Sequence, residues 1–530
     1  MKKFLTTFLF LLLSGLVCSQ DYFLPLNREW NLRYEPWLNS VESKAHTSFR
    51  PYRTVEIKTI APFDSLNQNN YLKDGKFHRT LIGRKLLKEN LFVIKEDGVT
   101  IRFNPLFELS GGTETEENKT VFTNTRGVWI DGTIGERFSF STTFRENQAQ
   151  LPFYLDAFTR KYKVVPNDGR VKDLYSNFDY ANVSGTISFS LKKHFNFQLG
   201  HDKNFIGDGY RSLLLSDNAY SYPFFKISTT FWKIKYVNLY TLLQDLQIPA
   251  PDDSRFKRKY GTFHYLDINI GKRFSFGVME AVIWKADSIK GRSFDFNYAN
   301  PIIFIRPVEF SIGSPDNMML GLNLKYKLTS NITLYGQAML DEFKISEVRS
   351  GDGWWGNKQA FQAGVKTADL LVENLHLQTE INYVRPFTYS HRSSLTNYAH
   401  FNQSLAHPLG SNFIESVSII NYNYKNYFLR AQLNYTILGA DTGQSNLGSD
   451  IFKSYDTYSF EYGNKITQGL EYTLMFADVR LGYLVNPNYN FVVEGGVIMR
   501  DDKPENADSF KTMMITFGIR TGITNRYLDF

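Results

Sequence analysis

Two adjacent tryptophans are the most distinctive candidates for ligand chemistry in this chain. Trp354 and Trp355 stand in the glycine-rich segment 351–356, GDGWWG. The glycine spacing matches the dinucleotide-binding fingerprint, but that site needs a helix behind it and bare backbone where the tryptophans stand. Indole rings instead stack on flat ligand faces such as those of sugars. We therefore predict that both residues bind a polysaccharide; the alternative is that they anchor their own loop.

A long segment of mixed character supplies the second group of candidates. Residues 201–223, HDKNFIGDGYRSLLLSDNAYSYP, combine three consecutive leucines with several charges. A freely exposed loop would not combine them, so we expect the segment to fold inward, with Asp202, Asp208 and Arg211 in one polar cluster. The segment then either plugs the interior or contacts a ligand directly.

The segment 300–309, NPIIFIRPVE, has a similar character. We expect it to fold into the same interior. Arg306 and Glu309 would be costly to bury there unless they pair. Both residues are therefore added to the candidate ligand-binding set.

The spacing of other reactive residues gives little support for catalysis or metal binding. His391, His400 and His407 share one predicted loop, but gaps of nine and seven residues are not those of a zinc site. The chain contains neither a nucleophile elbow nor a phosphate-binding loop. Asp441 and Asp450 are interpreted as solvated loop carboxylates rather than calcium ligands. We predict no catalytic residue, no metal and no cofactor.

The elements that hold these segments are long strands with two different faces. Apolar and polar residues alternate over about ten positions in one segment after another, as at 320–328, 375–383 and 429–437. About 18 such segments follow Val99, and short connections alternate with long ones between them. This pattern predicts a meander of antiparallel strands.

Strand length and charge favour a transmembrane barrel over a soluble sandwich. Strands of soluble sheets are typically about five or six residues long. A packed core would also not accept charges such as Lys325, Glu380 and Arg430 on the polar faces. A membrane barrel turns its apolar faces to lipid and its polar faces to a wet lumen, and its closure satisfies the backbone. We predict an all-β transmembrane antiparallel barrel of about 18 strands over 99–530, integral to the outer membrane of a Gram-negative cell, with extracellular loops.

Composition and charge exclude several other classes of protein. Charged residues make up 21% of the chain and aromatic residues 16%, which is far from the profile of a disordered chain. No apolar run reaches the ~18 residues that a helix needs to cross a bilayer. The net charge of +7 is too small and too dispersed to indicate nucleic-acid binding.

The N-terminus has the features of an export signal. Residues 1–19 combine a basic start, an apolar core and small residues, which predicts a signal peptide cleaved between Ser19 and Gln20. Lipid attachment at Cys18 is the alternative, although the residue before it is not small.

The residues between the signal and the first strand form a separate part. Residues 20–98 do not alternate, and we predict a small periplasmic segment at the lower rim of the barrel with a helix around 78–90. A loosely ordered leader over 20–60 is the alternative. At the other end the sequence finishes in Phe530, a terminal aromatic of the kind read by the barrel-insertion machinery, which we expect as a partner during assembly in the lipid bilayer.

Three motifs carry a resemblance to a known family. They are GDGYRSLLLSDNAYSYP at 207–223, NPIIFIRPVE at 300–309, and the Asn-Pro-Leu sequence at 104–106. On these motifs the chain resembles the capsule-assembly Wzi family, and more closely the RemB-type gliding motility proteins. The resemblance spans most of the mature chain by architecture. It implies an 18-stranded barrel, a small periplasmic helical part and a lectin-like role in holding capsule, and the RemB-type relatives imply a part in surface motility.

Together these observations lead us to expect a non-enzymatic outer-membrane barrel. It would bind or organise surface polysaccharide, either capsule or exopolysaccharide, and support gliding together with gliding-motility proteins. One alternative is an outer-membrane channel or secretion-associated barrel, which requires an open lumen. Another alternative is an outer-membrane hydrolase, which needs a Ser–His pair. Ser393 and His391 are candidates for it, but we interpret their closeness in the sequence as accidental.

Overall fold

The computed structural model describes most of the mature chain. The described residues are 21–72, 75–116, 118–174, 177–247, 256–286, 294–302, 316–342 and 344–530. The predicted signal peptide with its cleavage between Ser19 and Gln20 lies outside the described residues, as do Arg306 and Glu309. Across the described ranges, no helix has both the length and the apolar character required to cross a bilayer.

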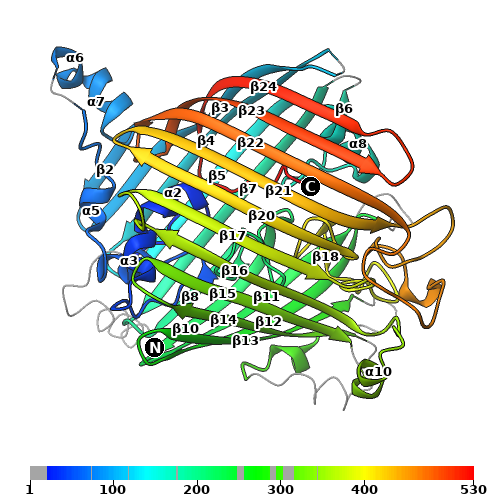
Figure 1. Ribbon diagram of the computed structural model, residues 1–530. Coiled ribbons are helices and arrows are strands. Elements are labelled where there is room, and N and C mark those ends of the chain that lie inside the picture. The colour runs from blue at the N-terminus through cyan, green and yellow to red at the C-terminus, as the bar shows by residue number, and fades with distance from the viewer. Residues whose placement is uncertain are drawn as a thin grey trace.

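Eighteen long strands of the described chain form one closed antiparallel barrel (Figure 1). Each strand pairs with its neighbour in sequence, and the last strand pairs with the first, so that the sheet has no long open edge. The predicted fold class is thereby confirmed. The strands are β3 (Val99–Glu114), β4 (Lys119–Ile134), β5 (Phe138–Gln150), β7 (Asn177–Leu191), β8 (Phe195–Asp202), β10 (Tyr222–Phe231), β11 (Ile234–Asp245), β12 (Lys257–Ile270), β13 (Phe274–Lys285), β14 (Asn317–Lys327), β15 (Ile332–Glu342), β16 (Lys358–Ala368), β17 (Leu375–Val384), β20 (Phe413–Tyr424), β21 (Tyr427–Ala440), β22 (Leu470–Asn486), β23 (Phe491–Pro504) and β24 (Phe510–Thr521).

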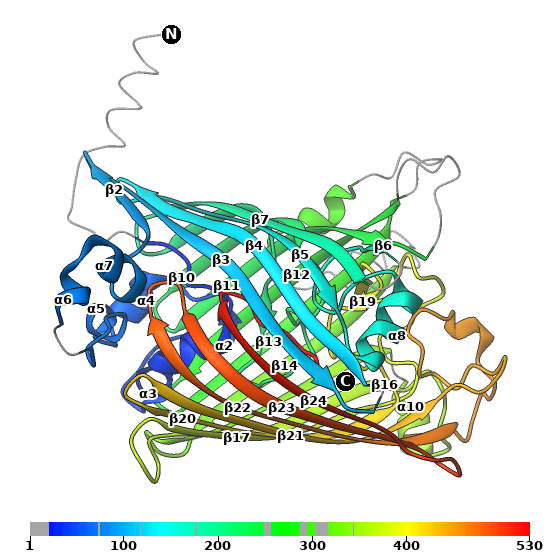
Figure 2. The ribbon, with the colours of Figure 1, turned by 90° about the horizontal axis from the view of Figure 1, so that it is seen from above.

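The two ends of the barrel differ in their connections. One end, here called the short-turn end, carries tight turns such as that at Gly135, and the helices of the N-terminal part gather there (Figure 2). The opposite end, the long-loop end, carries the long connections with α8 (Phe153–Tyr162) and α10 (Ile345–Ser350). Helices of the N-terminal part are α2 (Arg28–Asn31), η1 (Leu32–Tyr34), α3 (Glu35–Asn39), α4 (Thr54–Lys58), α5 (Phe63–Leu66), α6 (Lys76–Arg79) and α7 (Leu81–Leu87).

Small additional strands extend or brace the barrel. β2 (Phe92–Glu96) forms a hairpin with β3, so the sheet begins before residue 99. The other short strands form pairs within the loops or pair with a long strand. They are β1 (Phe49–Arg50) with β9 (Phe205–Ile206), β18 (Ala399–His400) with β19 (Gln403–Ser404), and β6 (Lys172–Leu174) with β7.

The outward faces of the strands form an apolar belt. Large side chains such as Leu199, Leu481 and Phe517 are more than 60% exposed on this surface. A soluble protein rarely exposes so wide an apolar surface to water. Exposed aromatic side chains lie at the short-turn end of the belt, as membrane-spanning barrels have at their interfaces. They include Phe138, Phe231, Trp232, Tyr326, Tyr424 and Tyr427. The belt is therefore the lipid-facing surface of a transmembrane barrel.

Protein fills the centre of the lumen, as in the plug that we predicted as one of two alternatives for residues 201–223. The loop at 203–221 folds into the barrel, and Leu213, Leu214 and Leu215 are fully buried at the centre of a hydrophobic core. This core also includes inward side chains of the strands and of the long loops, such as Met339 and Tyr398.

Some inward charges have partners on the inserted loop: Lys325 Nζ lies 3.8 Å from Asp208, and Glu380 accepts the Arg211 amide at 2.9 Å. Others, such as Arg480 and Glu494, pair between strands. Alternation by itself therefore did not require water there.

The N-terminal part enters the barrel instead of lying only at its rim. Trp30 packs edge-to-face on Trp129 of β4 with ring centroids 6.0 Å apart, and β1 pairs with β9 of the luminal loop. The predicted helix around 78–90 is two short helices, α6 and α7. They are separated at Thr80, whose hydroxyl accepts a hydrogen bond from the Gly83 amide at 3.0 Å. Residues 21–60 are ordered, so the loosely ordered leader is not observed in the described part.

The C-terminal residues turn back into the lumen after β24. Residues 522–530 run toward the long-loop end, where the Tyr154 hydroxyl donates to the Leu528 carbonyl at 2.7 Å. Phe530 packs on Phe158 of α8 with ring centroids 5.1 Å apart. Phe530 thus lies beyond the last strand, and its role as an insertion signal stays a prediction.

The segment that we expected beside the luminal loop lies partly on the outside of the barrel. Residues 294–302, here called the strap, include η2 (Phe296–Ala299). Tyr298 of the strap packs with Val282 and Trp284 of β13, whereas their strand neighbours Ala281 and Ile283 belong to the luminal core. Because successive residues of a strand point to opposite faces, the strap covers the outward face. The expectation that this segment enters the mouth is wrong for residues 300–302.

Candidate ligand-binding site at the barrel mouth

The three candidates of the luminal loop have separate partners instead of forming one cluster. Asp202 ends β8 and accepts the backbone amide of Lys203 at 2.8 Å. Asp208 is buried, accepts Asn323 Nδ2 at 3.2 Å and lies 3.8 Å from Lys325 Nζ. Arg211 is buried elsewhere among carboxylates. Asp208 and Arg211 are buried and do not face solvent, whereas Asp202 is half-buried.

Arg211 connects the luminal loop to the wall and to the C-terminal tail. Its guanidinium donates to Glu415 of β20 at 2.6 Å and to Asp529 at 3.0 Å, and all three side chains are almost completely buried. His407 Nε2 lies 2.6 Å from the same Glu415 carboxylate. A further carboxylate, Glu380, accepts the Arg211 amide at 2.9 Å. This network fixes the plug, so a ligand cannot reach Arg211 while the loop is in place.

The tryptophan pair belongs to an aromatic cluster among the long loops. The Trp355 ring is stacked on Tyr458 at 5.1 Å and lies 4.9 Å from Tyr455, and Trp354 is tilted against it at 5.7 Å. Gly353 allows the motif to approach the facing loop closely, because a Cβ at this position would lie 2.7 Å from a backbone oxygen of that loop. Both indoles are half-buried. The arrangement matches the loop-anchoring alternative more closely than a free stacking platform.

An open cleft at the long-loop end is better placed to hold a ligand. The cleft has a volume of about 410 Å³, which falls within the usual range for small-molecule sites. It lies between α8, the loop around β18 and β19, and the loop at 441–469. Phe530 of the tail contributes to its lining. Three segments far apart in sequence therefore meet around one cavity at the mouth.

Aromatic rings and charged groups share the lining of this cleft. Tyr162 and Phe452 are tilted by 44° against each other with ring centroids 6.1 Å apart, and Lys161 Nζ lies 4.8 Å from the Tyr162 ring. Burial raises the pKa of the Tyr162 phenol, so its hydroxyl keeps its proton. Lys453 donates to Asp441 at 2.7 Å. Ring faces beside hydrogen-bonding groups suit a ligand with one apolar face and many hydroxyls.

Asp441 and Asp450, which we interpreted as solvated loop carboxylates, accept hydrogen bonds from their own loop. Asp441 accepts the Leu447 amide at 2.9 Å in addition to Lys453, and Asp450 accepts the Phe452 amide at 2.9 Å. These bonds shape the loop so that Phe452 reaches the cleft. Asp450 itself lines the cavity and is half-buried.

The three histidines of the predicted loop lie in different surroundings. His391 Nδ1 lies 2.7 Å from Thr396 Oγ1, and His400 Nδ1 accepts the Gln244 amide at 2.9 Å. Burial lowers the pKa of His391 to about 3, helped by Lys358 and Arg392. The pKa of His400 is also lowered to about 3, again mainly by burial.

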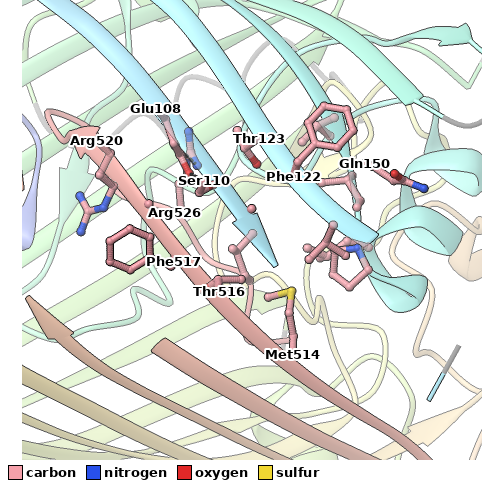
Figure 3. A pocket seen from close by; sticks show the side chains of 18 of the residues that line it. Glu108, Ser110, Phe122, Thr123, Gln150, Met514, Thr516, Phe517, Arg520 and Arg526 are labelled. Carbon is pink, nitrogen blue, oxygen red and sulfur yellow. Dashed lines mark hydrogen bonds and ion pairs between the residues drawn. The ribbon is translucent and has the colours of Figure 1, made fainter. Parts of the chain in front are cut away.

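A second cavity lies beside the seam where β24 meets β3 (Figure 3). Its volume is about 110 Å³. Arg526 pairs with Glu108 at 2.6 Å, and Arg520 pairs with Glu494 at 2.9 Å. Because these charges already have partners and the space is small, we do not assign a ligand to this cavity.

Sequence reasoning missed the residues of the cleft. Tyr162 and Lys161 end a helix inside a connection, and Phe452 stands in a loop whose pattern is polar and irregular. The available signal was limited to an aromatic residue in each of two long loops. No local pattern shows that these loops meet.

One of the comparisons with known proteins supports the fold. No family model matches the chain, and no curated protein does. Among solved structures, the chain is similar to Wzi of Escherichia coli, described as an outer membrane protein involved in group 1 capsule assembly and a carbohydrate-binding β-barrel. The TM-score is 0.56 at 12% identity, covering 95% of this chain and 100% of that one. OccAB2 of Acinetobacter baumannii reaches 0.44 at 9% identity, covering 80% of this chain and 99% of that one.

Proposed function

We propose that this protein binds surface polysaccharide at its long-loop end, as an integral barrel of the outer membrane with that end outside the cell, and without catalysis. The cleft between α8 and the loop at 441–469 is the single observation that carries the proposal. Its adjacent rings, Tyr162 and Phe452, and its charged groups suit a sugar. The fold likeness to a carbohydrate-binding barrel supports it.

The packed lumen supports a holding role rather than transport. A channel needs a continuous open path, whereas the loop at 203–221 fills the centre of the barrel with fully buried leucines. Arg211 fastens this loop to the wall. We therefore place the alternative of a channel or secretion-associated barrel second. A stable open-state conductance of the purified protein in planar bilayers would reverse that order.

A binding experiment with short oligosaccharides tests the cleft. Fragments of the cell's own polysaccharide avoid the multivalency of the polymer, which would hide weakening at a single site. We expect Tyr162→Ala and Phe452→Ala each to weaken binding about two- to tenfold, the range expected for loss of one aromatic contact. Trp232→Ala is the matched control, because this tryptophan is 79% exposed at the short-turn end. Equal affinity of all variants would contradict the assignment.

A cellular experiment tests the role itself. In a deletion strain, we expect polysaccharide to move from the cell surface into the medium. Expression of the wild type or the Trp232→Ala variant should restore the distribution, and the Tyr162→Ala, Phe452→Ala double variant should not. An unchanged distribution in the deletion strain would refute the holding role. Support of gliding motility, which the RemB-type resemblance implies, stays a prediction that colony spreading of the same strain tests.

A further inference from the structure

Helices α6 and α7 project from the edge of the short-turn end (Figure 1, Figure 2). They are here called the rim hairpin, residues 76–88. The turn between β22 and β23 holds the C-terminal end of this hairpin by hydrogen bonds to its backbone. Asn486 Nδ2 donates to the Lys85 carbonyl at 3.1 Å, and Asn488 Nδ2 donates to the Lys88 carbonyl at 2.8 Å. The rim hairpin therefore has a fixed place on the barrel.

This place is on the lipid-facing side of the wall. The Tyr489 hydroxyl donates to the Lys85 carbonyl at 3.2 Å, and its ring is stacked on Phe491 with ring centroids 6.2 Å apart. Phe491 lies on the same face of β23 as Met499, which is 50% exposed on the belt. Leu87 of α7 packs against the cluster that contains both rings. The hairpin is thus docked where the belt meets the rim.

The chain also leads from the rim hairpin onto the belt. β2 begins at Phe92, five residues after the end of α7, and Phe92 packs on Phe103 of β3 with ring centroids 5.9 Å apart. Phe103 shares its strand face with Leu109, which is 50% exposed on the belt. Phe92 itself is 61% exposed. The apolar surface of the belt therefore continues toward the hairpin.

The rim hairpin exposes large apolar side chains of its own. Leu81 and Ile82 are 64% and 72% exposed, and Phe77 is 51% exposed. Leu86 lies one turn after Ile82 on the same face of α7 and is 39% exposed. Single exposed apolar residues are ordinary, but a cluster of them on two short helices indicates an interaction site.

The same hairpin is strongly basic. Five cations and no carboxylate stand between residues 75 and 88, namely Lys76, Arg79, Arg84, Lys85 and Lys88. The flanking residues Lys73, Asp74 and Glu89 bring the totals to six cations and two carboxylates, a net charge of +4. Glu89 pairs with Lys85 at 2.9 Å and lies 3.5 Å from Arg84, so the excess of positive charge persists. Exposed apolar side chains among cations are typical of helices that lie at a membrane surface.

We propose that the rim hairpin inserts into the surface of the bilayer that the barrel spans and binds its anionic phospholipids. Phe77, Leu81 and Ile82 enter the outer part of the acyl region, and the exposed cations Lys76 and Arg84 contact phosphate oxygens of the head groups. This contact would hold the N-terminal part at the membrane surface. It requires the transmembrane barrel but not the sugar site at the opposite end.

A nitroxide spin label at Ile82→Cys tests the insertion in lipid nanodiscs. The one cysteine of the sequence, Cys18, lies in the predicted signal peptide, so the mature protein carries a single label. With phosphatidylglycerol in phosphatidylcholine discs, we expect the label to collide with oxygen dissolved in lipid and not with a neutral, water-soluble nickel chelate. Leu481→Cys, at a site 63% exposed on the belt, gives the lipid reference. Ser65→Cys, exposed on the polar helix α5, gives the water reference.

A double variant tests the charge. At the phosphatidylglycerol content that immerses half of the wild-type label, Lys76→Gln with Arg84→Gln should lower the ratio of immersed to exposed label about thirtyfold, as expected for two basic residues at an anionic surface. Lys192→Gln with Lys193→Gln, two exposed lysines of the turn between β7 and β8, is the matched control and should leave the ratio unchanged.

Three results would overturn the proposal. They are a label at residue 82 as open to the nickel chelate as that at residue 65, equal immersion in discs of phosphatidylcholine alone, and an unchanged ratio in the Lys76→Gln, Arg84→Gln variant. Protection of residue 82 in isolated cell membranes but not in nanodiscs would also overturn it, and would assign the hairpin to a protein partner instead.

Discussion

Replacing Arg211 by methionine should release the luminal plug. The change removes the cation that joins Glu415 and Asp529, at 2.6 and 3.0 Å, and leaves both carboxylates buried. Breaking one side of a buried ion pair costs about 3–5 kcal/mol, because the remaining charge keeps no equivalent partner. His407 still contacts Glu415 at 2.6 Å, so we expect the lower half of that range, about 3 kcal/mol.

The barrel wall can remain closed when the plug opens, so the assay must report locally. We would measure amide hydrogen exchange of residues 203–221 by mass spectrometry in detergent. Local opening made easier by about 3 kcal/mol raises exchange of this segment by at least about a hundredfold. The strands of the wall should exchange as in the wild type.

Two further variants decide between electrostatics and general damage. Lys272→Met breaks an exposed pair with Glu42 whose side chains are 67% and 75% exposed, and it should leave exchange unchanged. Adding Glu415→Gln and Asp529→Asn to Arg211→Met neutralises the stranded charges and should recover part of the protection. Exchange in Arg211→Met within threefold of the wild type would refute the reasoning, and so would a triple variant no better protected than the single one.

Two other changes, a lower pH and the Gly277→Ala substitution, should lower the stability of the protein. His391 and His400 have folded-state pKa values of about 3, below the unfolded value of about 6.5, so the unfolded loop binds more protons between these values. Stability of the long loops should be full above pH 6.5 and fall as the pH drops toward 3, seen as a lower urea midpoint at pH 4 than at pH 7; equal midpoints would contradict it. Gly277→Ala places a Cβ 2.2 Å from the hydroxyl of buried Tyr265 and should destabilise the barrel by about 1–3 kcal/mol in the same urea assay. Gly495→Ala, with nothing closer than 3.6 Å, is the control, and a loss equal to that of Gly277→Ala would argue against the steric cause.

The wall of the barrel was predictable because its determinants are local. Period-two alternation marks each strand, and turn residues such as Gly135 with a positive φ mark its ends. A long series of such strands with one apolar face has few stable solutions other than closure in a membrane. Strand number and the alternation of short and long connections follow from the same patterns.

What fills the lumen depended on contacts between distant segments. Arg211 and Asp529 are 318 residues apart in the chain, and no local pattern links them. An inward strand face with charges is compatible with water or with a plug that brings the opposite charges. A plug fills the lumen here because the inserted loop, the C-terminal tail and the N-terminal part complement the charges of the inward strand faces.

The same reasoning explains the candidate site and the strap. The strap sequence is apolar and aromatic with few charges, which suits a protein core and a lipid-facing surface equally well; only docking against Asn238 and Tyr240 places it outside. Tyr162 and Phe452 form a cleft because two long loops converge at one end of a closed sheet. Alternation along a strand is set by backbone geometry within a few residues and can be read from the sequence. The meeting of loops is set by barrel closure over the whole chain, and only the folded structure decides it.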